Sequence, residues 1–207
     1  MITAPEVEAY LYGLLPPSTP VLREMEEQAR QRNIPIVGPA VARLFRLLAA
    51  TAGARRVFEL GSAIGYSTIW WAEAVGPEGE VFYTDSSPAN CAEAAAYVQR
   101  AGVQSRVRLL EGEALAMLAR TAGDFDIIFC DLDKVQYPEA FRQAVPRLRS
   151  GGLLVADNVL WSGKVASPPQ DPETAAILDF NRALYADARL EPVILPLRDG
   201  VAVARKK

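Results

Sequence analysis

The sequence predicts an α/β fold: a doubly wound, mostly parallel sheet of seven strands, with an N-terminal helical extension and a C-terminal antiparallel hairpin. From Arg56 onward, short apolar runs alternate with stretches of helical spacing. Continuous apolar runs are typical of strands covered on both faces, and strand–helix alternation indicates parallel strands with right-handed crossovers. Near the end, Arg198–Gly200 is a turn signal between two strand-like runs, which predicts the hairpin.

Residues 1–52 are predicted to form the helical extension. Thr19 is a capping residue and Pro20 suits the first helical position, so a charged helix is expected from there to about Asn33. The segment Ile34–Pro39 breaks this helix. Apolar residues then return at helical spacing, namely Val41, Leu44, Phe45, Leu47 and Leu48.

Five strand-like runs come next: Val57–Leu60, Val81–Thr84, Val107–Leu110, Ile127–Asp131 and Leu153–Asp157. Helical stretches separate them near Ser67–Ala74, Pro88–Ala101, Ala114–Ala119 and Tyr137–Leu148. Ser87 and Gly102 flank the second of these helices with the expected cap chemistry. After a loop at Ser162–Pro172, the pattern predicts a helix to about Tyr185 and then the hairpin strands Pro192–Pro196 and Val201–Ala204.

Composition excludes several classes of enzyme. The chain has no histidine, which excludes a Ser-His-Asp triad, a Cys-His pair and a zinc site built on imidazole. Its two cysteines, Cys91 and Cys130, are too far apart for a Cys-x-x-Cys site and are interpreted as reduced packing thiols. A bound metal would therefore need oxygen ligands, which favours Mg²⁺, Ca²⁺ or Mn²⁺.

The length of 207 residues suits one domain spanning 1–207. The net charge of −3, with acidic and basic residues interspersed, argues against nucleic-acid and membrane-surface partners. The first residues show no secretory signal, and no uncharged stretch is long enough to span a membrane. We therefore expect a cytoplasmic location.

Two polar clusters each end an apolar run. Asp131 to Lys134 follows the strand-like run that ends at Cys130, and Asp157 with Asn158 follows another. Parallel strands end at the edge where open α/β sheets bind ligands. Three oxygen donors and the Lys134 amine would meet there, as in a site for a hard cation with a base beside it. Two alternatives remain: Lys134 only neutralises its neighbours, or Asp157 and Asn158 form a turn or helix cap.

A glycine-containing loop, Glu59–Ser67, joins the first strand of the sheet to its helix. Glycine allows a ligand to approach the main chain closely, but the dinucleotide motif requires glycine where this chain has Ala63 and Tyr66. A ligand without phosphates, such as S-adenosylmethionine, depends less on those glycines. Glu59 lies among apolar residues, where an unpaired carboxylate is costly unless it faces a cationic group.

Asp85 ends the second strand. An acid at this position accepts hydrogen bonds from ribose hydroxyls in nucleotide-binding α/β folds. The alternative is a solvated acid or a cap for the helix that starts at Pro88.

Together, Glu59–Ser67, Asp85, Asp131–Lys134 and Asp157–Trp161 resemble the motifs of the cation-dependent O-methyltransferases. These S-adenosylmethionine-dependent enzymes include catechol and caffeoyl-CoA O-methyltransferases. The resemblance runs from about Ile34 to the C-terminus. It implies the Rossmann-like fold of class I methyltransferases, a homodimer, and transfer of a methyl group to one hydroxyl of a vicinal diphenol that is chelated by Mg²⁺ (or Ca²⁺ or Mn²⁺).

The resemblance also implies roles for individual residues. S-adenosylmethionine would contact Val37, Glu59, Gly61, Ser62, Ser67, Asp85, Ala114, Asp131 and Asp133. The metal ligands would be Asp131, Asp157 and Asn158, with Lys134 as the base and Asp131 as a further catalytic residue. Trp161 and Ser162 would contact the acceptor, although Trp161 alone is equally well explained as a packing residue. The extension 1–52 would cover the cofactor and contribute dimer or substrate contacts.

Two other functions are open at this point. One is an NAD(P)-dependent oxidoreductase on a similar fold, disfavoured by Ala63 and Tyr66. The other is a non-catalytic cofactor-binding module, which would show no turnover on any acceptor. The sequence leaves the diphenol and the position that is methylated open.

Overall fold

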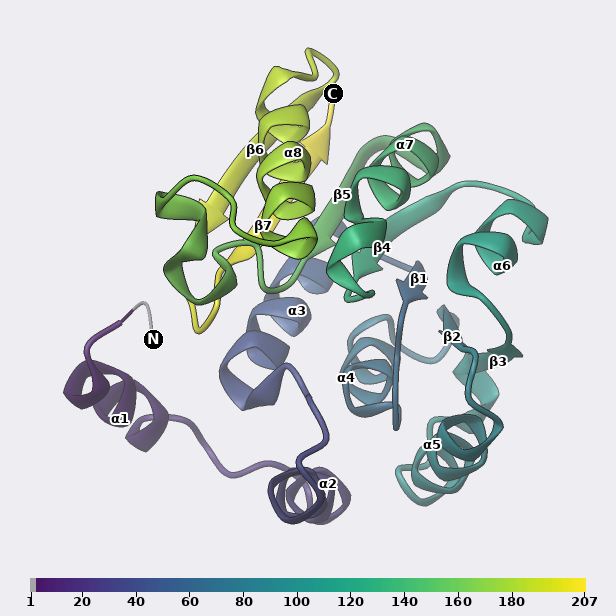
Figure 1. Ribbon diagram of the computed structural model, residues 1–207. Helices are drawn as coiled ribbons and strands as arrows, with labels where there is room; N and C mark the ends of the chain where they lie inside the picture. The colour runs from purple at the N-terminus through teal and green to yellow at the C-terminus, as the bar shows by residue number, and fades with distance from the viewer. Residues whose placement is uncertain (1–2) are drawn as a thin grey trace.

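A seven-stranded sheet runs through the centre of the computed structural model, which describes residues 3–207, and helices cover both of its faces (Figure 1). The strand order is β3-β2-β1-β4-β5-β7-β6; the first five strands pair in parallel, and β7 is antiparallel to both of its neighbours. The predicted fold class, including the antiparallel hairpin, is confirmed. The strands are β1 (Arg56–Leu60), β2 (Glu80–Asp85), β3 (Val107–Glu111), β4 (Phe125–Cys130), β5 (Leu148–Ala156), β6 (Leu190–Leu195) and β7 (Val201–Lys206).

Three helices precede the first strand, and the others lie between strands. The helices are α1 (Pro5–Gly13), α2 (Pro20–Arg32), α3 (Gly38–Ala52), α4 (Tyr66–Ala74), α5 (Pro88–Arg100), α6 (Ala114–Arg120), α7 (Tyr137–Arg147) and α8 (Pro172–Ala186). Short 3₁₀ helices are η1 (Gln104–Arg106), η2 (Lys134–Gln136) and η3 (Trp161–Ala166). Helix α1 buries no side chain and lies at the periphery of the molecule (Figure 1).

Each face of the sheet has its own hydrophobic core. On one face α2, α3, α4 and α5 pack together, and the ring of Phe45 stacks on Trp71 with 4.3 Å between their centroids. On the other face α6, α7 and α8 pack, and Tyr137 meets Phe180 edge to face. Burying such a side chain contributes roughly 1.5–3 kcal/mol, so the two cores hold the strand ends in fixed positions.

Most predicted boundaries lie within a few residues of the observed ones. Ser87 caps α5 as predicted, because its hydroxyl accepts from the amide of Asn90. Strand β5 differs, since it begins at Leu148 and not at Leu153. Leu148 pairs with Phe125 and Leu153 with Ile127, so the polar and glycine-rich stretch Arg149–Gly152 lies at an irregularity in register between β5 and β4. None of the helices in residues 3–207 is both long and apolar enough to cross a bilayer.

Candidate active site at the carboxyl edge of the sheet

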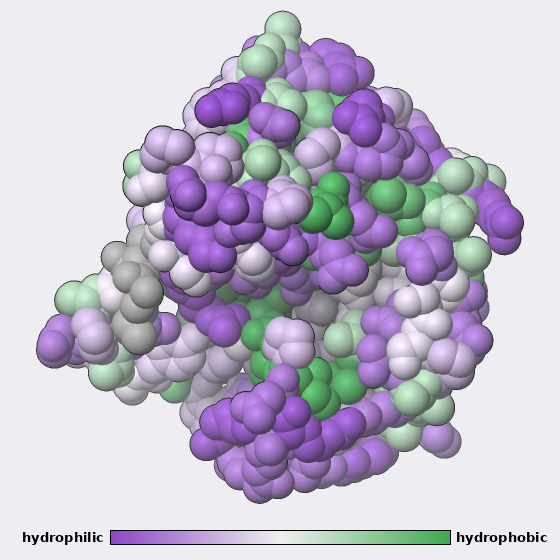
Figure 2. All heavy atoms as spheres, in the orientation of Figure 1, coloured by the Kyte–Doolittle hydropathy of each residue, from purple (hydrophilic) through white to green (hydrophobic). Residues whose placement is uncertain are grey.

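A cavity of about 1140 Å³ lies where the central parallel strands end, and the segment Ile34–Val37 forms part of its wall. Figure 2 shows a hollow on this face, with hydrophobic residues inside it and hydrophilic residues around it. This is the edge at which the fold class binds its ligands. The cavity brings together most of the residues that the sequence singled out: Val37, Gly61, Ser62, Ser67, Asp85, Asp131, Asp133, Lys134, Asp157, Asn158 and Trp161.

The glycine loop between β1 and α4 forms one side of the cavity. Gly61 has a φ of 84°, and a Cβ added there would lie 2.5 Å from the main-chain oxygen of Asp131. Only glycine fits such an approach. The loop is held in place by the amide of Ser62, which donates to the oxygen of Thr84 at 3.0 Å. Ser62 and Ser67 thereby face the cavity on a rigid support.

Glu59 lies beneath this loop and is completely buried, so it does not line the cavity. Its carboxylate accepts from the hydroxyls of Ser62, at 3.1 Å, and Thr68, while Oε1 has no partner in the described chain. Burial raises the pKa of Glu59 to about 7, against the opposing effect of these hydroxyl groups. Glu59 therefore holds the base of the loop from below through Ser62 and Thr68, and its predicted contact with the cofactor stays a prediction.

Asp85 lines the cavity and also holds the main chain around it; the predicted contact with the ribose hydroxyls stays a prediction. Its side chain lines the cavity at the end of β2. Its Oδ2 accepts from the amide of Ala63 at 3.0 Å, and Oδ1 accepts from the amide of Ser87 at 2.8 Å and from the Asn90 side chain at 3.1 Å. The carboxylate thus fixes the glycine loop and the start of α5 while it remains accessible to a ligand.

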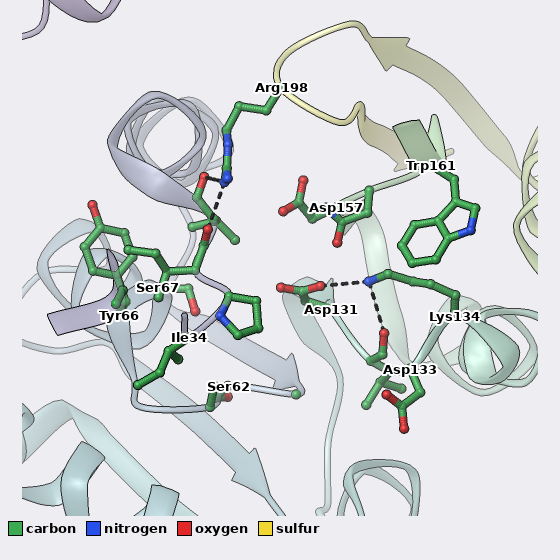
Figure 3. Close-up of a pocket in the computed structure, with 18 of the residues that line it drawn as sticks. Ile34, Ser62, Tyr66, Ser67, Asp131, Asp133, Lys134, Asp157, Trp161 and Arg198 are labelled. Atoms are coloured by element: carbon green, nitrogen blue, oxygen red, sulfur yellow. Dashed lines mark hydrogen bonds and ion pairs between the residues drawn. The ribbon is translucent and has the colours of Figure 1, made fainter. Parts of the chain in front are cut away.

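The two acid clusters meet because β4 and β5 are neighbouring parallel strands. Cys130 pairs with Ala156, so Asp131 and Asp157 leave the sheet side by side. Lys134 Nζ donates to Asp131 Oδ1 at 3.0 Å and to the oxygen of Leu132 at 3.1 Å (Figure 3). It also donates to the hydroxyl of Tyr137 at 2.9 Å. These three bonds use all the protons of an ammonium group. To act as a base, Lys134 must enter the reaction with one proton fewer.

The Asp157 carboxylate is buried at the edge of the cavity and has an unpartnered oxygen within the described residues. It is 2% exposed, and its buried Oδ1 has no hydrogen-bond partner in the described chain. Burial and the charge of Asp131 raise the pKa of this carboxyl group. The next residue, Asn158, has a φ of 58°, a conformation rare outside glycine.

The donor set of two carboxylates and one amide suits a hard divalent cation, which needs six or more oxygen ligands in all. Within residues 3–207 no cluster of three or more Cys, Asp or Glu side chains has a metal-binding arrangement. A cation here would therefore rely on the Asn158 amide and on oxygens of substrate or water besides Asp131 and Asp157.

The chain matches the model of a family described as O-methyltransferase over residues 16–207. It belongs to this O-methyltransferase family. It is 33% identical over 210 residues to a catechol O-methyltransferase of Niastella koreensis, an alignment that covers 96% of this chain and 95% of the relative.

Solved structures agree with this membership. An O-methyltransferase from Bacillus cereus in complex with SAH superimposes with a TM-score of 0.89 at 30% identity, covering 100% of both chains. The O-methyltransferase TomG from Streptomyces achromogenes, involved in tomaymycin synthesis and solved with SAM, gives 0.88 at 28% identity, covering 98% of this chain and 96% of that one. The chain is an S-adenosylmethionine-dependent O-methyltransferase, as predicted, and the oxidoreductase alternative is wrong.

Besides Glu59, two predicted site residues of this O-methyltransferase lie off the cavity wall. Ala114 is buried at the start of α6, and Ser162 donates its amide to the carboxylate of Asp199. Ser162 sits within η3 with a φ of 54°, so its position is set by that turn and not by the cavity.

Sequence reasoning missed other residues of the O-methyltransferase site. The Tyr137 hydroxyl donates to the main-chain oxygen of Asp157 at 2.8 Å, and its position three residues after Lys134 was an available signal. The Tyr66 hydroxyl donates to Glu26 at 2.8 Å and thereby ties α2 to α4 beside the cavity. Arg198 reaches the cavity from the turn between β6 and β7, where its sequence context indicates only a turn.

Proposed function

We propose that this O-methyltransferase moves the methyl group of S-adenosylmethionine to one hydroxyl of a vicinal diphenol and requires a divalent cation for this reaction. The observation that carries the proposal is the unpartnered, buried Oδ1 of Asp157. It lies at the edge where Asp131 and Lys134 interact and next to the Asn158 amide. Buried polar atoms are nearly always partnered, and a cation held between this oxygen and the neighbouring oxygen donors would supply the partner.

Asp131, Asp157 and Asn158 would hold the cation, with Mg²⁺ as the expected ion and Ca²⁺ or Mn²⁺ as substitutes. When bound there, a divalent cation would chelate two adjacent hydroxyl groups and lower the pKa of one of them. This requirement favours a vicinal diphenol over a monophenol.

The chain's own residues would do the rest. Gly61, Ser62, Ser67 and Asp85 would hold the sulfonium donor, and orientation of bound reactants is worth roughly 7–11 kcal/mol in favourable systems. Lys134 would accept the phenolic proton as the methyl group passes to oxygen and S-adenosylhomocysteine leaves. Such proton transfer typically increases the reaction rate by about 10²–10⁴-fold. Trp161 lies on the cavity wall with its ring centroid 5.9 Å from Lys134 Nζ, where it would pack against the acceptor ring.

The test is a panel of diphenol and monophenol acceptors with labelled S-adenosylmethionine, run with Mg²⁺ and with EDTA. We expect methylation of diphenols only, abolished by EDTA and restored by excess Mg²⁺. Asp157→Ala should abolish the response to Mg²⁺, whereas Glu173→Gln, at an exposed acid on the cavity rim, should keep it. Full activity in EDTA would sink the metal requirement, and no turnover on any acceptor would favour a non-catalytic module.

We further propose that the enzyme is a cytoplasmic homodimer. Val7, Tyr10, Leu11 and Leu14 are exposed on or beside α1, which supports burial of this helix against a second copy. Both cysteines are free and buried, which agrees with a reducing compartment. Light scattering should report a dimer that Tyr10→Glu weakens and that Tyr185→Glu, at another exposed position, on α8, leaves intact. A monomeric wild-type protein would contradict the proposal.

A further inference from the structure

Arg198 reaches from the turn between β6 and β7 into the same cavity, and its guanidinium group is directed toward main-chain oxygens across from Asp157 (Figure 3). Both hydrogen bonds of its guanidinium group use Nη1, which donates to the main-chain oxygens of Ile36, at 2.8 Å, and Val37. Gly38 leaves room for this arrangement, since a Cβ there would lie 3.3 Å from Nη1. The group is thus held by one nitrogen, and within residues 3–207 its other donors form no hydrogen bond.

Charge pairing distinguishes Arg198 from the other cations of the cavity. Lys134 is paired with Asp131, Lys164 with Asp171, and Arg30 with Glu27. Within residues 3–207, Arg198 forms no ion pair with a carboxylate. It lines the same cavity as Asp157, one of the proposed metal ligands. A fixed guanidinium with free donors is suited to binding a carboxylate through two parallel hydrogen bonds.

The main chain at Arg198 gives an independent reason to assign it a function. The amide of Gly200 donates to the oxygen of Leu197 at 2.9 Å, so Arg198 is the first central residue of a tight turn. Its φ is 51°, a conformation that favours glycine at this position. Residues with strained main chains of this kind cluster at active sites and ligand-binding sites.

We infer that Arg198 is a specificity-determining residue that selects diphenol acceptors carrying a carboxylate, which it binds while the hydroxyls face Asp157 and Lys134. This inference rests on the proposed function. The methionine carboxylate of the cofactor offers the same chemistry, so the experiment must distinguish the two sources.

The first test compares acceptors of equal ring chemistry: 3,4-dihydroxybenzoate and caffeate, each against its uncharged methyl ester. For the wild type we expect a higher kcat/KM for the acid in at least one pair. Arg198→Gly places at this position the residue that the turn favours. It should lower kcat/KM for that acid by roughly tenfold or more, and it should change kcat/KM for the ester by less than about threefold. Arg198→Lys should retain part of the preference. Equal losses for acid and ester, or weaker binding of S-adenosylhomocysteine, would overturn the inference.

The second test needs neither turnover nor metal. Calorimetry would measure binding of the same acids and esters to the protein loaded with S-adenosylhomocysteine in the presence of EDTA. We expect the acid to bind more weakly to Arg198→Gly than to the wild type, by roughly tenfold, with the ester unchanged. This result would support the inference even if no diphenol were methylated. The absence of methylation would contradict only the proposed function. Equal binding of the acid to both proteins would overturn the inference.

Discussion

The hydroxyl group of Tyr137 lies 2.9 Å from Nζ of Lys134 and 2.8 Å from the main-chain oxygen of Asp157. It therefore joins the proposed base to the strand end that carries a proposed metal ligand. Tyr137 is completely buried, and its ring packs edge to face on Phe180 with 5.3 Å between centroids. The hydroxyl can be removed without changing this packing.

Tyr137→Phe should lower kcat by roughly tenfold, because the substitution removes one hydrogen bond that fixes Lys134. Binding of S-adenosylhomocysteine should not change, since the phenol does not reach the cavity wall. Rapid-quench kinetics and calorimetry would measure the two quantities. Tyr185→Phe, at an exposed position on α8, is the matched control. An unchanged kcat would show that Asp131 and the oxygen of Leu132 suffice to position the amine.

Lys134→Ala should reduce turnover by at least about tenfold while the affinity for the cofactor stays nearly the same. Lys164→Ala is its control, because Lys164 also lines the cavity and lies 5.6 Å from the Trp161 ring but is exposed and paired with Asp171. Steady-state kinetics with a saturating diphenol would compare the turnover of the two variants. Equal loss of turnover and cofactor affinity in Lys134→Ala would mean that the residue is structural.

Asp85→Asn should weaken binding of S-adenosylhomocysteine by roughly 1.5–3 kcal/mol, the scale of a hydrogen bond to a charged group. Asparagine keeps the size of the side chain and an oxygen that can accept from the loop amides of Ala63 or Ser87. Calorimetry together with the melting temperature would distinguish a lost ligand contact from a disordered loop. Unchanged affinity in a stable variant would contradict the ribose-binding role.

The convergence of Asp131 and Asp157 was predictable from sequence, because each ends an apolar run and parallel strands end at one edge. The place of Arg198 in the site was not predictable. Its contact with Ile36 joins residues 162 positions apart, and no local sequence pattern indicates such a contact. The position of Glu59 was predictable only in part. Its apolar neighbours predicted a costly carboxylate, but whether a side chain at a strand end points into the cavity or beneath the loop depends on tertiary packing.

The buried Glu59 carboxyl group should make the stability of the unliganded protein depend on pH. Its pKa in the folded protein is raised from 4.5 to about 7 by burial. The folded state therefore holds the proton more tightly than the unfolded state. The resulting stabilisation is fully present below the unfolded pKa and is lost as the pH rises through about 7. A shift of this size corresponds to about 3 kcal/mol.

Glu59→Gln removes the titration and keeps an oxygen that can accept from Thr68. Urea unfolding between about pH 5 and 8.5 would give the free energy of unfolding of both proteins. We expect the wild type to lose up to about 3 kcal/mol relative to Glu59→Gln over this range, with most of the loss complete by about pH 8. Glu111→Gln, at an exposed acid ending β3, should instead follow the wild type. A pH-independent difference between the wild type and Glu59→Gln would mean that Glu59 keeps its charge when buried, stabilised by the hydroxyls of Ser62 and Thr68.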